Sequence, residues 1–135
     1  MANVQVVYVN PQKGNDKYNG TVRRPFATIQ AAVDAAGLFQ NGVSDSRTVV
    51  KLAEAYYAED VDLFGTDGTL LVGITFIGDS TYSSTIINSI GISAPTTKLR
   101  QFAMHNIEVY NNCDFISNTS SKFGNYGAEL INCWF

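Results

Sequence analysis

Three acidic residues lie close together in the first half of the sequence and are the first candidates for chemistry: Glu59, Asp60 and Asp62. Paired carboxylates act as acid, base or nucleophile in glycoside hydrolysis, and carboxylate oxygens also bind Ca²⁺. Alternation along a strand directs Asp60 and Asp62 to one face, the outer face if Val61 and Leu63 are in the core. A calcium site would need more ligands than these two carboxylates, so we favour a solvated outer strand face.

A second candidate group combines aromatic and acidic side chains: Trp134, Tyr110 and Asp114. Aromatic faces pack on sugar rings as they do on other apolar surfaces, and an acid beside them accepts hydroxyl hydrogens. We therefore predict these three as carbohydrate-binding residues. The alternative is that Trp134 only covers the edge of the next layer of the fold.

The remaining reactive side chains indicate no catalytic centre. His105 is the single histidine and suits a general base by its ordinary pKa, but no Asp or Ser partner is evident, so we expect a turn or surface histidine. Cys113 and Cys133 are too few for a disulfide framework; they form either one disulfide or, as we favour, stacked free thiols. No Walker loop, dinucleotide fingerprint, HExxH or paired CxxC occurs. We predict no catalytic residue, no metal and no cofactor.

The composition bounds the class of protein. The chain has 135 residues, 45% hydrophobic and 16% charged, which fits one folded domain and argues against disorder. The net charge is −3 and no Lys/Arg cluster exceeds the pair Arg23–Arg24, so we exclude nucleic acid as a partner. No basic start followed by an apolar run, and no apolar stretch of ~20 residues, is present, so we expect a soluble protein without a standard signal peptide or membrane span.

The N-terminal part of the sequence predicts a strand, a loop and one helix. Val4–Val9 is a β-branched run that Asn10-Pro11 ends, and Gln12–Thr21 is a turn-rich loop. Thr28 is the expected N-cap and Gly37 the expected C′ residue. The helix has one apolar face at i, i+3, i+4 and i+7, formed by Ile29, Ala32, Val33 and Ala36. We expect this face to cover the open apolar end of the first coil of strands in the rest of the chain. The alternative is one helix in an ordinary α+β domain.

The rest of the chain predicts short strands separated by turns, at 48–52, 61–64, 69–77, 85–87, 99–104, 107–110, 115–116 and 129–131. A faint repeat accompanies the last of them, because Asn112-Cys113-Asp114-Phe115 returns as Asn132-Cys133-Trp134-Phe135 after 20 residues. The same shift matches Tyr110 with Leu130. If the chain returns to the same position after one turn, like residues stack at the ~4.8 Å strand spacing. We predict this stack for Asn112 on Asn132, Cys113 on Cys133 and Phe115 on Phe135; chance similarity is the alternative.

The segment from Tyr8 to Ala36 also carries a known motif order. It contains an aromatic-Val strand, a Gly-Asn-Asp turn, an Asn-Gly-Thr turn and a Pro-Phe-x-Thr-Ile-Gln-x-Ala-Val helix: Tyr8-Val9, Gly14-Asn15-Asp16, Asn19-Gly20-Thr21, and Pro25-Phe26 through Ala32-Val33. This order resembles the N-terminal cap of right-handed β-helix proteins of the pectate lyase-like superfamily. Ile74–Asp79 is similar to the Ile-x-Ile-x-Gly coil of that superfamily, whereas Ala53–Tyr56 departs from its Pro-Gly-x-Tyr turn.

The resemblance implies a mostly β fold, a right-handed parallel β-helix (a single-stranded solenoid) with one N-terminal capping α-helix. Residues 1–46 would form the cap and residues 47–135 the first coils, which continue beyond or are covered by a partner. The superfamily includes lyases, hydrolases, esterases and phage tailspikes, so the fold alone does not decide the activity.

We expect a non-catalytic structural or host-recognition virion protein of the phage tailspike, fibre or capsid-decoration type. It would be made in the cytoplasm, would be located in the virion or at the cell exterior, and would form a homotrimer or join other virion proteins. The reason is that an apolar solenoid end needs covering and that few coils are available for a catalytic cleft. Polysaccharide is a possible ligand. The alternatives are the N-terminal part of a polysaccharide lyase, hydrolase or esterase acting on cell-surface glycans, and a surface module that holds glycans with Tyr110 and Trp134.

Overall fold

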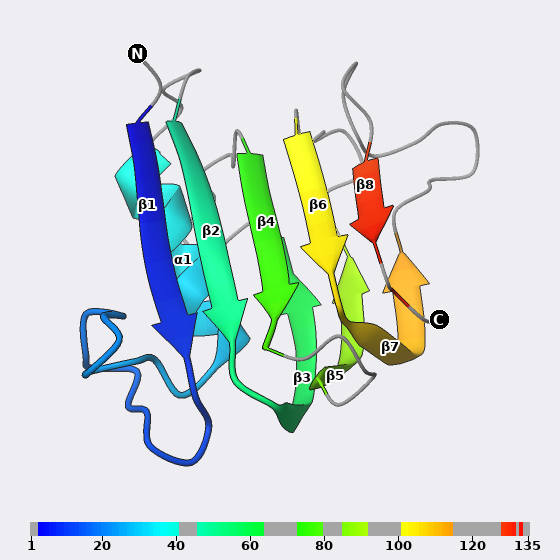
Figure 1. Ribbon diagram of the computed structural model, residues 1–135, viewed down its shortest axis with the longest axis horizontal. Coiled ribbons are helices and arrows are strands. Elements are labelled where there is room, and N and C mark those ends of the chain that lie inside the picture. Colours follow the sequence, from blue (N-terminus) through cyan, green and yellow to red (C-terminus); the bar gives the residue numbers. More distant parts are fainter. Residues whose placement is uncertain are drawn as a thin grey trace.

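The computed structural model describes residues 3–40, 46–63, 73–79, 85–91, 101–114, 128–131 and 133. This part of the chain is mostly β, with parallel sheets and one helix (Figure 1). The elements are β1 (Asn3–Val9), α1 (Ile29–Gln40), β2 (Ser46–Leu52), β3 (Ala55–Asp62), β4 (Gly73–Gly78), β5 (Thr85–Gly91), β6 (Gln101–His105), β7 (Glu108–Asp114) and β8 (Ala128–Ile131).

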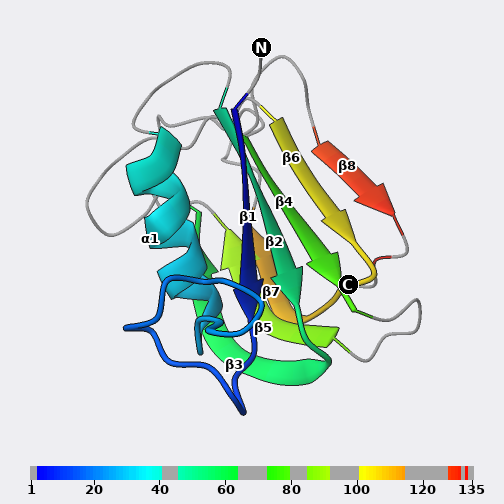
Figure 2. The same cartoon turned by 60° about the vertical axis from the view of Figure 1, so that its left-hand side comes forward.

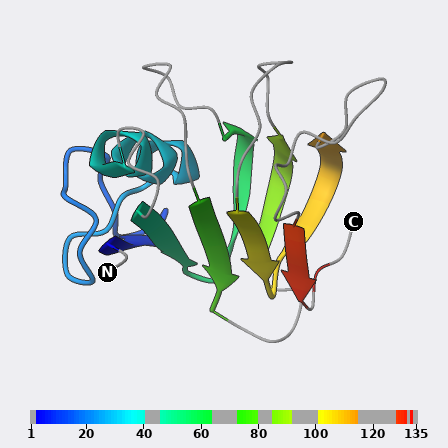
Figure 3. The same ribbon diagram turned by 90° about the horizontal axis from the view of Figure 1, so that it is seen from above.

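The strands form two sheets. Sheet A has the order β1-β2-β4-β6-β8 and sheet B the order β3-β5-β7, and the pairs within both are parallel. From β2 onward, successive strands therefore alternate between the sheets. Seen from above, the sheets form two facing layers, and α1 continues the layer of sheet B opposite β1 (Figure 3).

One hydrophobic core fills the space between the layers. Both sheets contribute to it mainly through every second residue of their strands, as the pleat requires, and a register irregularity in sheet B accompanies the inward positions of both Ile87 and Ile90, which are three residues apart. In β2, for example, Val50 and Leu52 are buried while Lys51 between them is exposed. The core residues of sheet A include Val7, Val9, Val50, Leu52, Ile74, Phe76 and Met104, and those of sheet B include Tyr57, Val61, Ile87, Ile90 and Val109.

Helix α1 packs on β1, β2 and β3 (Figure 2). Its four predicted core residues are each 0% exposed, which confirms the predicted face: Ile29, Ala32, Val33 and Ala36. Thr28 is the N-cap, because its Oγ1 accepts a hydrogen bond from the Ala31 N–H at 3.2 Å. The prediction that Gly37 ends the helix was wrong, since α1 continues to Gln40. Gly37 lies four residues after Val33 and is buried on the same face, so packing outweighs its low helix propensity.

Strands β3, β5 and β7 also differ from expectation. Strand β3 begins at Ala55 rather than at Val61, because the alternation of inward and outward residues already includes the buried Tyr57 and continues without a break to Val61. Strand β7 spans 108–114 and is longer than the strand predicted at 107–110, whereas the strand predicted at 115–116 lies outside the described residues. Strand β5 spans 85–91 rather than 85–87.

The 20-residue repeat is not the register of sheet A. Leu130 pairs with Met104, 26 residues earlier, whereas Tyr110 lies in sheet B, so the match of Tyr110 with Leu130 was wrong. The physical reason is that each strand returns to its own sheet only after the chain has crossed to the other one. Asn112 pairs with Ser89 in β5. Asn132, Phe115 and Phe135 lie outside the described residues, so their predicted stack stays a prediction.

Cys133 is a free thiol, which excludes the disulfide alternative with Cys113. Its Sγ donates to the carbonyl oxygens of Met104 at 3.2 Å and Ile131 at 3.4 Å, and burial raises the pKa of this thiol. The side chain of Cys113 lies outside the described set.

Candidate functional site

The outer face of sheet B carries two exposed tyrosines. Tyr56 on β3 is 54% exposed and Tyr110 on β7 is 72% exposed. Their rings meet edge to face, with centroids 6.5 Å apart and an interplanar angle of 76°. With Ile86, on the strand between them, they line a shallow hollow of about 330 Å³. We call these three residues the aromatic face.

The strand pattern explains why these rings point outward. Tyr56 precedes Tyr57, which is 2% exposed and belongs to the core, so alternation directs Tyr56 to the opposite side. Val109 is likewise buried, which directs Tyr110 outward. The parallel register places Tyr56 directly beside Ile86. Large aromatic residues favour strands, so the local sequence supports this arrangement.

A polar network adjoins the aromatic face. The Tyr56 hydroxyl donates to Asn88 Oδ1 at 3.2 Å, and Asn88 Nδ2 donates to Asp60 Oδ1 at 2.9 Å. The Ser89 hydroxyl donates to the same Asp60 oxygen at 2.6 Å. The hydrogen bonds from Ser89 and Asn88 lower the pKa of Asp60, so this carboxylate is a charged acceptor at neutral pH.

The charge around this face is negative. Glu108 on β7 pairs with Ile86, and Asp60 lies on β3. The sequences of β3, β5 and β7 contain no Lys, Arg or His. The face therefore combines an aromatic platform with hydrogen-bond acceptors, an arrangement that suits a neutral ring bearing hydroxyl donors.

Of the predicted carbohydrate-binding residues, the structure places Tyr110 in the aromatic face. Asp114 is the last residue of β7, with its backbone opposite Gly91, and its side chain is outside the described set. Trp134 also lies outside the described residues. Sequence reasoning missed Tyr56, Ile86 and Asn88. The adjacent pair Tyr56-Tyr57 was the available signal, because alternation leaves one of two neighbouring tyrosines on the outer face.

The three clustered acids have separate roles. Val61 and Leu63 are buried, as expected for the neighbours of an outward Asp60. Glu59 instead faces α1, where its carboxylate accepts hydrogen bonds from the backbone N–H groups of Ile29 at 2.8 Å and Gln30 at 3.1 Å. Burial raises the pKa of Glu59 despite these bonds. Within the residues that the structure describes, no group of three or more His, Cys, Asp or Glu side chains is placed to hold a metal ion.

His105 is the last residue of β6. Its backbone pairs with Ile77 on one side and Ile131 on the other. Met104 beside it is 0% exposed, so the imidazole lies on the outer face of sheet A, where it is half-buried.

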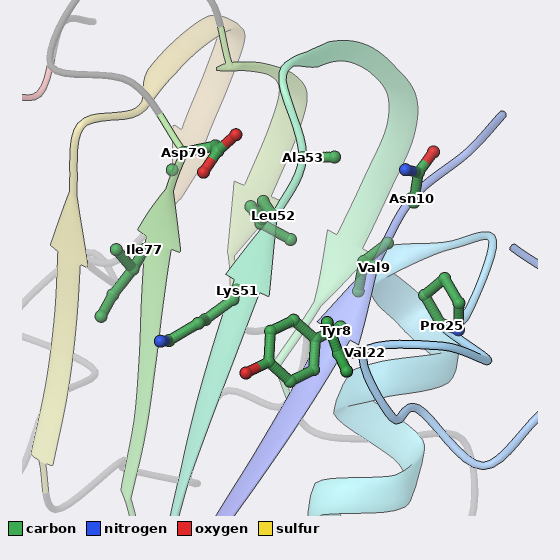
Figure 4. A pocket seen from close by; sticks show the side chains of 11 residues that line it. Tyr8, Val9, Asn10, Val22, Pro25, Lys51, Leu52, Ala53, Ile77 and Asp79 are labelled. Carbon is green, nitrogen blue, oxygen red and sulfur yellow. The ribbon is translucent and has the colours of Figure 1, made fainter. Parts of the chain in front are cut away.

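A second hollow, of about 450 Å³, lies between the loop that joins β1 to α1 and the ends of β1, β2 and β4 (Figure 4). We call this loop, residues 10–28, the cap loop. The ammonium of Lys51 lies 5.9 Å from the centre of the Tyr8 ring. We call this hollow the cap hollow; it is lined by Tyr8, Val9, Asn10, Val22, Pro25, Lys51, Leu52, Ala53, Ile77, Gly78 and Asp79.

No protein-family model matches the chain, and no curated protein or solved structure shows significant similarity to it. Among the described residues, no helix has the length and apolar character needed to cross a membrane.

Proposed function

We propose that this chain is a non-catalytic structural and host-recognition component of a virion, of the tailspike, fibre or capsid-decoration type. In this proposal it is built on a right-handed parallel β-helix and binds cell-surface polysaccharide through the aromatic face. The alternation of strands between two parallel sheets supports the solenoid, since each coil of a β-helix contributes one strand to each sheet. Helix α1 is then its N-terminal cap.

The aromatic face is the observation that carries the recognition role. Exposed tyrosine rings that meet edge to face offer an apolar edge and face to the C–H groups of a pyranose. The adjacent Asp60 carboxylate accepts hydrogen bonds from sugar hydroxyls, and its network with Asn88 and Ser89 fixes its position. Strands rather than loops hold these groups, which favours a preformed site.

Assembly into a trimer, or with other virion proteins, is part of the same proposal. Strands β7 and β8 end sheets B and A in the described order. Parallel strands of a further coil or of a second subunit would continue both sheets there, and would cover the apolar layer between them. Light scattering coupled to size-exclusion chromatography tests this point: a trimer supports it, and a stable monomer of the full-length product contradicts it.

A binding experiment on immobilised bacterial surface polysaccharides tests the recognition role. The wild type is expected to retain at least one neutral polysaccharide, and the double variant Tyr56→Ala/Tyr110→Ala to lose it. Tyr18→Ala is the matched control, because Tyr18 lies in the cap loop and stacks with Arg24 at 5.0 Å, away from sheet B. Equal binding by the double variant contradicts the role of the aromatic face. New reducing ends or unsaturated products from the retained polysaccharide contradict the non-catalytic proposal.

A further inference from the structure

The cap hollow differs from the aromatic face in shape, position and charge. It lies on the outer side of sheet A, beside the loop that leads into α1 (Figure 4). Its volume of about 450 Å³ is within the usual range for sites that hold a small ligand. Its lining combines one aromatic ring, one cation, one carboxylate and apolar side chains that include Val22, Pro25 and Ile77.

The register of sheet A builds the row of side chains at this hollow. Tyr8 pairs with Lys51, and Lys51 pairs with Ile77. Since Val50 and Leu52 point to the core, Lys51 must point outward, and its two register partners share that face. Neighbouring strands are ~4.8 Å apart, so the ring, the ammonium group and the isoleucine form one continuous surface.

The charge at the Lys51 end is positive. Within the described part of the chain, the Lys51 ammonium contacts the Tyr8 ring and makes no ion pair. The acidic residue of this lining, Asp79, lies beyond the end of β4, above Lys51 in the view of Figure 4. All described Lys and Arg residues lie in the cap loop and β2: Lys13, Lys17, Arg23, Arg24, Arg47 and Lys51.

The acid of the cap loop does not offset this charge at the hollow. Asp16 accepts hydrogen bonds from the N–H groups of Ala27 and Thr28, both at 2.9 Å, and from the Thr28 hydroxyl at 2.8 Å. Its carboxylate is thus committed to the start of α1. Lys51 is therefore the cation that an anion meets in the lining of the cap hollow.

We infer that the cap hollow binds an anionic sugar unit, one whose ring carries a carboxylate or a sulfate. The acidic group would lie on Lys51 Nζ, the sugar ring would pack on Tyr8, and a hydroxyl would donate to Asp79. The choice of a saccharide rests on the proposed function, but the site is separate from the aromatic face, whose negative charge disfavours such a ligand.

Titration of ¹⁵N-labelled protein, followed by amide NMR shifts, tests this assignment with four probes: glucuronate, glucose 6-sulfate, glucose and acetate. Shifts at Lys51, Gly78 and Asp79 are expected with one or both anionic sugars, and about tenfold weaker binding with glucose and acetate. Lys51→Gln is expected to weaken anionic-sugar binding about tenfold. Arg47→Gln is the matched control, since Arg47 is exposed on the same strand and face, loses the same charge, and does not line the hollow.

Three results overturn the inference: no shifts at the hollow with either anionic sugar, glucose or acetate binding as tightly as glucuronate, or equal weakening by Arg47→Gln. The Tyr110→Ala variant distinguishes failure of the inference about the cap hollow from failure of the proposed function of the aromatic face. It is expected to keep its glucuronate or sulfate response at the hollow while losing the polysaccharide bound by the aromatic face. Loss of both responses in Tyr110→Ala contradicts two separate sites.

Discussion

The side-chain amide of Gln30 pairs with both backbone groups of Asp62. Gln30 Nε2 donates to the Asp62 carbonyl at 3.0 Å, and Gln30 Oε1 accepts from the Asp62 N–H at 2.9 Å. A neighbouring strand would offer the edge of β3 the same donor and acceptor. The helix thereby closes one edge of sheet B with a side chain, which limits pairing with another chain at that edge.

Replacing Gln30 by Ala is expected to destabilise the fold. Both hydrogen bonds to Asp62 are lost and its partly buried N–H is left without the amide partner, which costs about 1–3 kcal/mol. Urea unfolding measures the change, with Gln12→Ala as control because Gln12 is exposed in the cap loop. An unchanged free energy of unfolding in Gln30→Ala would show that the edge is closed by other contacts.

The contribution of Glu59 to stability is expected to fall as pH rises. Burial raises the pKa of this carboxyl in the folded state, so its contribution is fully present below the ordinary pKa and is lost as pH rises through the folded value. The difference in free energy of unfolding between wild type and Glu59→Gln, measured from about pH 4 to about pH 8, should therefore decrease with pH.

Asp60→Asn supplies a control of opposite sign, measured from about pH 2 to about pH 5, because a carboxyl with a lowered pKa titrates in that range. Hydrogen bonds from Ser89 and Asn88 lower the pKa of Asp60, so its contribution is present above the ordinary pKa and is lost as pH falls through the folded value. Parallel trends for the two variants would contradict the assignment of Glu59 to a buried environment and Asp60 to the outer face.

Gly14→Ala is expected to lower stability by about 1–3 kcal/mol. A Cβ at this position collides with the carbonyl oxygens of Phe26 and Asn10, and backbone atoms cannot move aside as a flexible side chain can. The Gly14 N–H also donates to the Asn10 carbonyl at 2.7 Å, which fixes the loop. Thermal unfolding compares it with Lys13→Ala, whose exposed side chain predicts a change within about 0.5 kcal/mol. A neutral Gly14→Ala would mean that the cap loop rearranges freely.

The segment from β1 through α1 was largely predictable because its signals are local. Thr28 and the apolar spacing from Ile29 to Ala36 determine where α1 begins and which face it buries, and both depend on residues within three turns. The prediction that α1 ends at Gly37 was wrong because the burial of Gly37 beside Val33 depends on tertiary packing. Gln30 lies in the same local pattern, but its partner Asp62 is 32 residues away. Its hydrogen bonds to the edge of β3 therefore could not be predicted from the local sequence.

The candidate site was predictable only in part for the same reason. Tyr110 is recognisable as an aromatic residue on a strand, but its partner Tyr56 is set by the register of two different strand pairs. The loop lengths between strands vary, so the register does not follow from a fixed repeat. Leu130 illustrates this, since the 20-residue spacing pointed to Tyr110 and the sheet pairs it with Met104.

The proposed ligand of the aromatic face is a neutral glycan. Isothermal titration calorimetry tests this most directly. The ligand is an oligosaccharide prepared from the immobilised polysaccharide that the wild type retains, and the proteins are wild type, Tyr56→Ala, Tyr110→Ala and the control Tyr18→Ala. Loss of an aromatic platform predicts a Kd about tenfold higher for each of Tyr56→Ala and Tyr110→Ala, with Tyr18→Ala unchanged. Equal affinity in all four proteins would contradict glycan binding by the aromatic face.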